Sequence, residues 1–198
     1  MRLAIFGCGG MGRETADLVR RTSLIDIVFV TDNGGPNVQG IPCVTAAALN
    51  KDDHIVFAIG DPAQRRRLSS LYRHSVSRPI IADTTKMSPF ASIGEGSILC
   101  DFVVVNNNSH IGRHFIGNVG CQISHDCIIG DFVTFSPKVS CNGWVEIGDD
   151  VLLGAGAVIR NGSSDKPLSI GRGAVIGAGA VVVKDIPAGA LVKGVPAR

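Results

Sequence analysis

The sequence predicts a small α/β domain at the amino end and a parallel β-helix over the rest of the chain. Near the amino end, a glycine-rich turn separates a short apolar run from a charged, helix-forming segment. Farther on, the dipeptide Ile-Gly begins at residues 93, 111, 129 and 147, and hydrophobic residues recur at every sixth position from 93 to 159. Such periods are typical of a solenoid built coil by coil, so we divide the chain into domains of residues 1–83 and 84–198.

The first domain alternates strands and helices. The apolar runs at 3–6, 27–31 and 54–59 predict short buried strands, and the segments 13–21 and 62–72 predict helices. The second helix follows Gly60-Asp61-Pro62, which is a favourable start because proline fits the first helical turn. This alternation predicts a parallel, doubly wound sheet.

The glycine turn fits the pattern G-x-G-x-x-G through Gly7, Gly9 and Gly12, and Asp32 follows about twenty residues later, as in NAD-binding folds. Only half of a Rossmann-type dinucleotide domain precedes the repeats, which leaves room for one nucleotide. Backbone N–H groups at the start of the helix could instead hold the diphosphate of a nucleotide sugar, while Asp32 or Asp61 contacts the ribose or base. A third interpretation is that the glycines serve only strand-to-helix packing.

A repeat of six residues cannot be helical, since a period of 3.6 would scatter the apolar positions around the helix. Three short strands with corners make one coil of eighteen, and stacked coils bury an aliphatic column. Gly117 is the one position of the series that is not hydrophobic. Cys121, Cys127 and Cys141 fall on inward phases, so we interpret them as core residues, and residues 161–169 as an inserted loop.

These repeats, together with the closing segment 183–198, resemble the hexapeptide-repeat acyltransferases, whose fold is a left-handed parallel β-helix and whose co-substrate is acetyl-CoA. With the motif of residues 7–14 added, nearly the whole chain resembles the sialic-acid O-acetyltransferase-like group. Its members include bacterial N-acetyltransferases of UDP-4-amino-sugars. The resemblance implies acetyl transfer to the 4-amino group of a UDP- or dTDP-linked amino sugar in bacterial glycan biosynthesis.

The segment 118–132 resembles the catalytic stretch of this family, and the general base of the family falls on His125. Asp126 matches an acidic residue that orients the base, and Asn118 matches a polar position near the substrates. The repeat adds independent support, because His125 lies two residues after inward Ile123 and should leave the prism at a corner. Gly143 lies eighteen residues later, where its N–H could stabilise an oxyanion or where it could simply form a tight corner.

The resemblance also implies positions for the nucleotide sugar and for acetyl-CoA. Cys121 and Cys127 should point inward, which favours direct transfer without a covalent intermediate. Thr134 stands where the family often has a second histidine near the acetyl-CoA carbonyl. The expected nucleotide-sugar residues are Gly7, Gly9, Gly10, Asp32, Asn33, Gly60 and Asn118, and the expected acetyl-CoA and oxyanion residues are Thr134, Gly143, Gly154, Ala155 and Lys193.

Three other functions stay open at this stage. The first is O-acetylation of sialic acid or a related sugar, and the second is nucleotide-sugar binding without catalysis. The third is a zinc enzyme like the carbonic anhydrases of this fold, with His110, His114 and His125 as ligands. These histidines fall on different phases of the repeat, so we expect no metal.

Charge and hydropathy restrict the partners. The net charge is +2, and the one basic run, Arg65-Arg66-Arg67, is expected on a solvated helix face, so we expect no nucleic acid. The apolar run at 3–6 is too short for a signal peptide or a membrane span, which predicts a cytoplasmic protein. A corner histidine has no second wall for its cleft within one chain, and with the resemblance this predicts a homotrimer.

Overall fold

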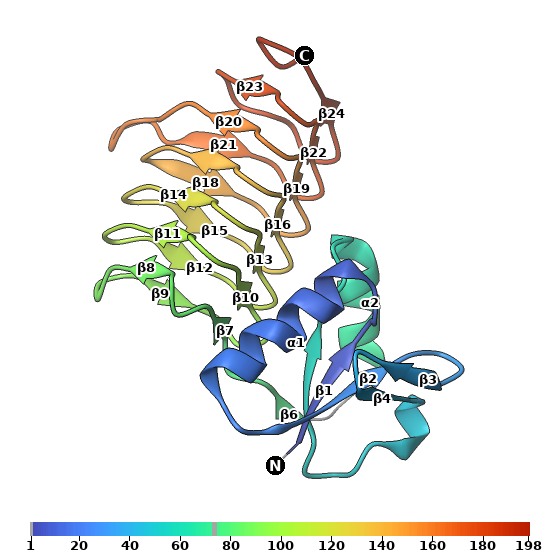
Figure 1. Ribbon diagram of the computed structural model, residues 1–198. Helices are drawn as coiled ribbons and strands as arrows, with labels where there is room; N and C mark the ends of the chain where they lie inside the picture. Colours follow the sequence, from blue (N-terminus) through green and yellow to red (C-terminus); the bar gives the residue numbers. More distant parts are fainter. Residues whose placement is uncertain (1, 73–74) are drawn as a thin grey trace.

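In the computed structural model, which describes residues 2–72 and 75–198, the amino-terminal domain is a six-stranded sheet (Figure 1). Its strand order is β3-β4-β2-β1-β5-β6. The strands are β1 (Arg2–Phe6), β2 (Asp26–Val30), β3 (Gly35–Val38), β4 (Ile41–Val44), β5 (His54–Phe57) and β6 (Ser75–Val76). All neighbours in this order pair in parallel except β3 and β4, which are antiparallel.

The β3–β4 hairpin is absent from the sequence prediction. Its connecting residues Gln39 and Gly40 both have positive φ, 50° and 75°, as a two-residue hairpin turn of type I′ requires. Asn or Asp is the usual first residue of such a turn, so Gln39 gives little signal. Gly35 and Pro36 further obscure the strand.

Two helices cover opposite faces of the sheet, as the alternating pattern predicts. Helix α1 (Gly10–Thr22) packs Leu18 and Val19 into a cluster with Leu3 and with residues of the β-helix. Helix α2 (Pro62–Leu71) packs on the other face, where Leu68 meets the cluster around Phe57. Asp61 caps α2, since its carboxylate accepts a hydrogen bond of 2.7 Å from the amide of Gln64. A short 3₁₀ helix, η1 (Ala46–Ala48), lies between β4 and β5.

The rest of the chain is a three-sided parallel β-helix, as expected. We call its faces sheets I, II and III. Sheet I contains β7 (Ile80–Ile81), β10 (Ile98–Leu99), β13 (Ile116–Gly117), β16 (Thr134–Phe135), β19 (Leu152–Leu153), β22 (Val175–Ile176) and β24 (Leu191–Val192). Sheet II contains β8 (Lys86–Met87), β11 (Val104–Val105), β14 (Gln122–Ile123), β17 (Ser140–Cys141), β20 (Val158–Ile159) and β23 (Val181–Val182). Sheet III contains β9 (Ser92–Ile93), β12 (His110–Ile111), β15 (Ile128–Ile129), β18 (Val145–Ile147) and β21 (Leu168–Ile170).

The coils stack in register with a repeat of eighteen. Ile98 pairs with Ile116, and Gln122 pairs with Ser140, so residues eighteen apart lie one above the other. The first prism strand, β7, begins at Ile80, shortly before residue 84. The corners that join sheet II to sheet III form one long edge, on the left of the prism in Figure 1.

From residue 96 to residue 156, each corner contains one residue in the left-handed backbone region, and this residue recurs every sixth position. The non-glycine members with φ between 55° and 60° are Phe102, Asn108, His114, Asp126, Phe132, Lys138, Trp144 and Asp150. Glycine fills the same role at Gly96, Gly120 and Gly156. A non-glycine residue in this region is uncommon, so the period of six is a property of the backbone as well as of the core.

The Ile-Gly repeat has a direct steric cause. Gly94, Gly112, Gly130 and Gly148 form a column at the corner between sheets III and I. A Cβ atom on Gly130 would lie 2.5 Å from Oδ1 of Asp149 and 2.7 Å from its backbone nitrogen. The coil above therefore occupies the space of a side chain, and only glycine fits.

The interior of the prism is apolar except for Ser97 and Ser109, whose buried hydroxyls bond to the backbone, and it confirms the interpretation of the cysteines. Cys121, Cys127 and Cys141 are at most 1% exposed, and all six cysteines of the chain are free. Gly117 breaks the hydrophobic series because the ring of Phe115 fills its place. A Cβ atom on Gly117 would lie 2.8 Å from that ring.

The two domains are joined through Arg65, and here the sequence prediction is wrong. Arg65 was expected on a solvated helix face, but its side chain is fully buried. Its guanidinium donates to the prism carbonyls of His114 (3.1 Å) and Phe132 (2.7 Å) and to the carbonyl of Ile59 (2.6 Å). Burial lowers the pKa of Arg65 to about 9, so the group still carries its charge at neutral pH.

His114 is packed beside this junction. Its ring stacks on Phe132 with centroids 4.6 Å apart and lies 5.7 Å from Phe57. Nδ1 is buried and has no hydrogen-bond partner among the described residues. Burial and then the nearby charge of Arg65 lower the pKa of His114 to about 4, which keeps the ring neutral in the folded protein.

The first prediction concerns the glycine column. We expect Gly130→Ala to lower the free energy of unfolding by roughly 1–3 kcal/mol, because the added methyl group must displace the backbone of the next coil. Urea denaturation measures the change. Gly60→Ala is the control, since its Cβ would meet no atom within 4 Å. Equal stability of the two variants would contradict the steric cause.

The second prediction concerns pH. The unfolded chain binds a proton at His114 near pH 6.5, whereas the folded protein binds it only near pH 4. The contribution of neutral His114 to stability is therefore complete above pH 6.5 and is lost as the pH falls toward 4, by on the order of 2 kcal/mol. We expect His114→Asn, which tolerates positive φ and does not titrate, to show a smaller loss of unfolding free energy between pH 7.5 and about 4.5. If His114→Asn loses as much unfolding free energy over this pH range as the wild-type protein, the pH dependence does not come from His114.

Candidate functional site

His125 lies on the edge between sheets II and III, at the corner that joins β14 to β15. Its side chain is 54% exposed, and its Nδ1 lies 2.8 Å from Oδ2 of Asp126. Adjacent side chains on a strand point to opposite sides, but Asp126 occupies the left-handed position of this corner, with φ of 56°. The corner geometry therefore brings two neighbouring side chains into contact.

Asp126 has a second partner one coil below. The amide of Asn108 donates a hydrogen bond of 2.7 Å to Oδ1 of Asp126. The bond from Asn108, followed by the bond to His125, lowers the pKa of Asp126, so this carboxylate stays ionised at neutral pH. An ionised carboxylate only accepts hydrogen bonds, so Nδ1 of His125 is the donor and Nε2 has the free lone pair.

Gly143 lies one coil above His125, directly against its ring. A Cβ atom on Gly143 would lie 2.6 Å from Cε1 and 2.7 Å from Nε2 of His125. The next residue, Trp144, donates its backbone N–H to the carbonyl of His125 (3.2 Å) and places its indole edge-on to the imidazole. Within the described ranges, the amide of Gly143 donates to no acceptor, although the residue itself is buried.

The residues of the first domain that the sequence predicts to bind a nucleotide sugar meet at the carboxyl ends of β1, β2 and β5. Gly7 and Asp32 line one cavity of about 290 Å³, together with Gln64 of α2 and Tyr72, which follows α2. Asn33 follows Asp32 in the adjoining loop. This is the edge of a parallel sheet at which ligands commonly bind.

The glycine turn combines packing with open backbone. Gly12 must lack a side chain because a Cβ atom there would collide with the carbonyl of Gly7. Gly9 and Gly10, in contrast, are exposed and have free space around them at the start of α1. The turn therefore serves strand-to-helix packing and also exposes helix N–H groups that suit a diphosphate.

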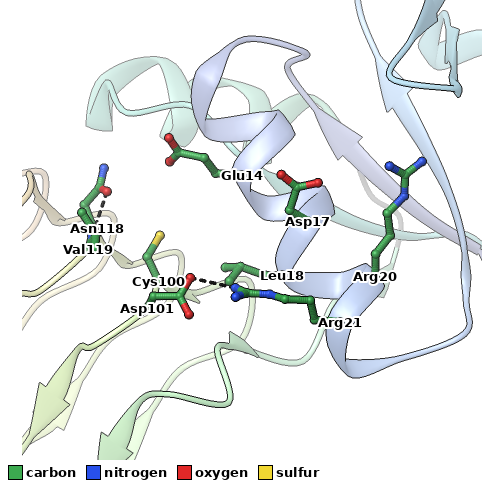
Figure 2. Close-up of a pocket in the computed structure, with 9 residues that line it drawn as sticks. All are labelled: Glu14, Asp17, Leu18, Arg20, Arg21, Cys100, Asp101, Asn118 and Val119. Atoms are coloured by element: carbon green, nitrogen blue, oxygen red, sulfur yellow. Dashed lines mark hydrogen bonds and ion pairs between the residues drawn. The ribbon is translucent and has the colours of Figure 1, made fainter.

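A larger cleft of about 670 Å³ separates α1 from the prism (Figure 2). Figure 2 shows the carboxylates of Glu14 and Asp17 on the helix, facing the side where Asn118 lies at the corner between sheets I and II. Burial and the nearby charge of Glu14 raise the pKa of the Cys100 thiol to about 12. The sequence analysis did not select Glu14 or Asp17, because their significance depends on which face of α1 meets the prism.

Several of the expected residues lie away from His125. Gly154, Ala155 and Lys193 lie on the edge between sheets I and II, on the same edge as Asn118. Thr134 is only 4% exposed, and its hydroxyl donates to the carbonyl of Gly60 (2.8 Å) at the domain junction. Gly60 and Thr134 thus connect the domains. Within one chain, His125, Asp126 and Gly143 lie on the edge between sheets II and III. Asn118, Gly154, Ala155 and Lys193 lie on the opposite edge of sheet II, next to sheet I.

The three histidines proposed as zinc ligands have different surroundings. His110 points outward from sheet III with Nδ1 2.8 Å from the hydroxyl of Ser92, His114 is buried at the domain junction, and His125 is on the edge. Across residues 2–72 and 75–198, no three His, Cys, Asp or Glu side chains are grouped to hold a metal ion. None of the helices in these ranges is long and apolar enough to cross a membrane.

Comparison with known proteins gives matches over the whole chain. A family model described as the PglD N-terminal domain matches residues 2–71. GDP-perosamine N-acetyltransferase of Escherichia coli O157:H7 is 40% identical over 207 aligned positions, which cover 98% of this chain and 94% of that protein.

Solved structures agree with the sequence relatives. WeeI from Acinetobacter baumannii AYE superposes with a TM-score of 0.94 at 36% identity and covers 100% of this chain and 99% of its own. PerB from Caulobacter crescentus, solved in complex with CoA and GDP-perosamine, has a TM-score of 0.89 at 30% identity, with coverage of 100% and 96%. All of these similarities include both domains.

Proposed function

Because the chain belongs to the hexapeptide-repeat family of sugar N-acetyltransferases, we propose that it transfers acetyl from acetyl-CoA to the 4-amino group of a nucleotide-linked amino sugar. The observation that carries this proposal is the arrangement of His125, Asp126 and Gly143 on one exposed edge. It supplies a base with a fixed tautomer and a free backbone donor beside it.

The reaction proceeds by direct transfer. Nε2 of His125 removes a proton from the sugar amine as the amine attacks the thioester carbonyl, and Asp126 stabilises the imidazolium that forms. The amide of Gly143 donates to the oxyanion of the tetrahedral intermediate. Collapse of the intermediate releases CoA as the thiolate, which takes the proton from His125. Cys121 and Cys127 are buried in the prism, which favours a mechanism without an acyl-cysteine intermediate.

The cleft beneath α1 supports an amine acceptor over a hydroxyl acceptor. Neither Glu14 nor Asp17 forms an ion pair within the described ranges, whereas the third carboxylate of the cleft, Asp101, is paired with Arg21 at 2.7 Å. A sugar amine arrives as an ammonium ion, and carboxylates at the cleft attract this charge. The ammonium ion releases one proton to solvent before the neutral amine attacks. A neutral sugar hydroxyl, as in the O-acetylation alternative, gains nothing from them.

The cavity at Gly7 and Asp32 holds the nucleotide, and the exposed amides of Gly9 and Gly10 hold its diphosphate. The sequence suggested UDP or dTDP. The relatives named for GDP-perosamine add GDP, which becomes the first nucleotide to test. Guanine offers two adjacent N–H donors, which a single carboxylate such as Asp32 can accept together, whereas uracil and thymine offer one.

The division of the site residues between two edges requires a second copy of the chain. His125 and Gly143 lie on one edge of sheet II, whereas Asn118, Gly154, Ala155 and Lys193 lie on the other. A neighbouring copy that brings its second edge to the first edge of this chain completes the site. Such a contact joins two different surfaces, which gives a ring when the rotation between copies closes, and the three-sided prism suits closure as a homotrimer.

The third prediction tests the base. We expect His125→Ala to lower kcat by roughly 10²- to 10⁴-fold with GDP-, UDP- and dTDP-linked 4-amino sugars as acceptors, because the attacking amine loses its proton acceptor. Release of free thiol from acetyl-CoA measures the rate, and free sialic acid tests the O-acetylation alternative. Unchanged transfer in His125→Ala would refute the assignment of the base.

Two glycine variants control this experiment. Gly143→Ala should lower kcat by about 10²-fold, since its methyl group displaces the imidazole. Gly173→Ala, whose Cβ meets no atom within 4 Å and whose φ of 69° is close to that of non-glycine residues at other corners, should lose some stability but remain active. Equal activities of the two variants would argue against the geometry around His125.

The fourth prediction tests the assembly. Sedimentation equilibrium should give a particle three times the 20.7 kDa mass of the chain, and dilution that dissociates it should abolish acetyl transfer. A fully active monomer would show that one chain contains the whole site.

A further inference from the structure

Another large cavity lies at the amino ends of the parallel strands, at the opposite end of the first domain from the cavity at Gly7 and Asp32. Its volume of about 640 Å³ is typical of small-molecule sites. The start of β1, the start of β5 and the end of α1 line it, at the lower end of the sheet in Figure 1. Ligands of parallel sheets commonly bind at the carboxyl ends of the strands, so this cavity lies outside the site proposed for acetyl transfer.

The segment that connects the two domains forms one wall of this cavity. Residues 77–81, which run from the end of β6 into β7, line it. The backbone N–H of Ser77 donates to the carbonyl of Ile55 (2.9 Å), and the carbonyl of Ser77 accepts from the amide of Gly96 (2.8 Å). The wall is therefore bonded to the sheet on one side and to the prism on the other, which favours a preformed cavity.

The cavity has an aliphatic lining, to which Leu3, Val19, Ile25, Ile80 and Ile81 contribute. The three isoleucines are only half-buried, so they retain apolar surface that a ligand can remove from water. Among the described residues, the lining contains no aromatic ring on which a planar ligand could stack. These walls favour an alkyl chain.

One buried polar group of the lining has no partner. Ser77 is 6% exposed, and its hydroxyl forms no hydrogen bond with any residue that the structure describes. Unpaired buried hydroxyls are rare in folded proteins because they lose their bonds to water without a replacement. A ligand that accepts a hydrogen bond from Ser77 supplies the replacement.

The charge of the lining is positive. Its charged side chains are Arg2 and Arg78, and none of the described residues that line it has a carboxylate. Arg2 already donates from Nε to Oδ1 of Asp53 (3.0 Å). Arg78 is exposed and forms no ion pair within residues 2–72 and 75–198. One uncompensated positive charge matches a ligand with a single negative charge.

We propose that this cavity binds an aliphatic monocarboxylate, with its alkyl chain against the isoleucines. The carboxylate accepts hydrogen bonds from the hydroxyl of Ser77 and the guanidinium of Arg78, two donors on neighbouring residues. Strand β1 has five residues and separates this cavity from the one at Gly7 and Asp32, so the two lie roughly 15 Å apart at about 3.3 Å per residue. The proposal does not depend on the proposed acetyl transfer.

Calorimetric titration of the intact protein with hexanoate, decanoate and 1-decanol tests the proposal. Decanoate should bind at least about tenfold more tightly than hexanoate, because four more methylene groups leave water. It should bind at least about fivefold more tightly than 1-decanol, which lacks the negative charge. Saturating GDP should leave the affinity for decanoate unchanged, since the two cavities are separate.

Two variants of the connecting segment test the polar end of the site. Arg78→Gln should remove the preference for decanoate over 1-decanol, whereas Arg67→Gln, which changes an exposed arginine of α2, should keep it. Ser77→Ala should weaken decanoate binding by about threefold or more without lowering the free energy of unfolding, because its hydroxyl has no partner among the described residues.

Two tryptophan variants test the apolar end. Ile25→Trp should fill the cavity and abolish decanoate binding. Leu24→Trp, which changes the fully exposed neighbour outside the cavity, should bind as the wild-type protein does.

Four outcomes would overturn the proposal. Equal affinities of the wild-type protein for decanoate and 1-decanol would exclude a carboxylate site, and unchanged binding in Ile25→Trp would show that decanoate binds elsewhere. Displacement by GDP would assign decanoate to the other cavity. A loss of stability in Ser77→Ala would give its hydroxyl a structural role instead. Failure of acetyl transfer with every acceptor would leave all of these tests intact, so the two proposals can fail separately.

Discussion

The buried guanidinium of Arg65 sets the relation between the two domains, and both ligand clefts depend on it. Its donors reach carbonyls of Ile59 and Gly60 on one side and of His114, Phe132 and Val133 on the other. A buried charge is costly unless its hydrogen bonds are satisfied, and these carbonyls satisfy them in one relative placement of the domains. Because Gln64 of α2 and Tyr72, which follows α2, line the cavity proposed for the nucleotide, fixing α2 against the prism also fixes this cavity.

The second constraint is the left-handed residue that recurs at the corners from residue 96 to residue 156, one of which holds Asp126 of the proposed site. The backbone of the coil requires positive φ at residue 126 whatever the side chain is. Aspartate tolerates this conformation better than most residues, and there its carboxylate turns toward the neighbouring imidazole. The coils below and above supply Asn108 and Gly143, each eighteen residues away. The proposed catalytic group therefore follows from the general repeat of the backbone.

The parts of the fold that follow a period could be predicted, and those that depend on a single tertiary contact could not. The period of six predicted the prism, the buried cysteines and the exposed corner of His125, because each depends only on the position of a residue within the repeat. The burial of Arg65 has no such signal, since a run of three arginines on a helix is normally solvated. Thr134 was expected near acetyl-CoA, but its contact with Gly60 forms only when the domains meet.

The cleft beneath α1 also contains residues whose place in a site could not be predicted from the sequence. Glu14 and Asp17 are ordinary surface residues in the sequence, and they acquire a possible role only because α1 lies across from Asn118. In the proposed reaction an amine bound there must meet a base, and His125 of the same chain lies across the width of sheet II. The outward residues between the two edges are Lys86, Val104, Gln122, Ser140, Val158 and Val181, of which only Lys86, in the first coil, is charged. A face with so little charge suits contact with a second copy, which would join the acceptor cleft of one chain to the base of another.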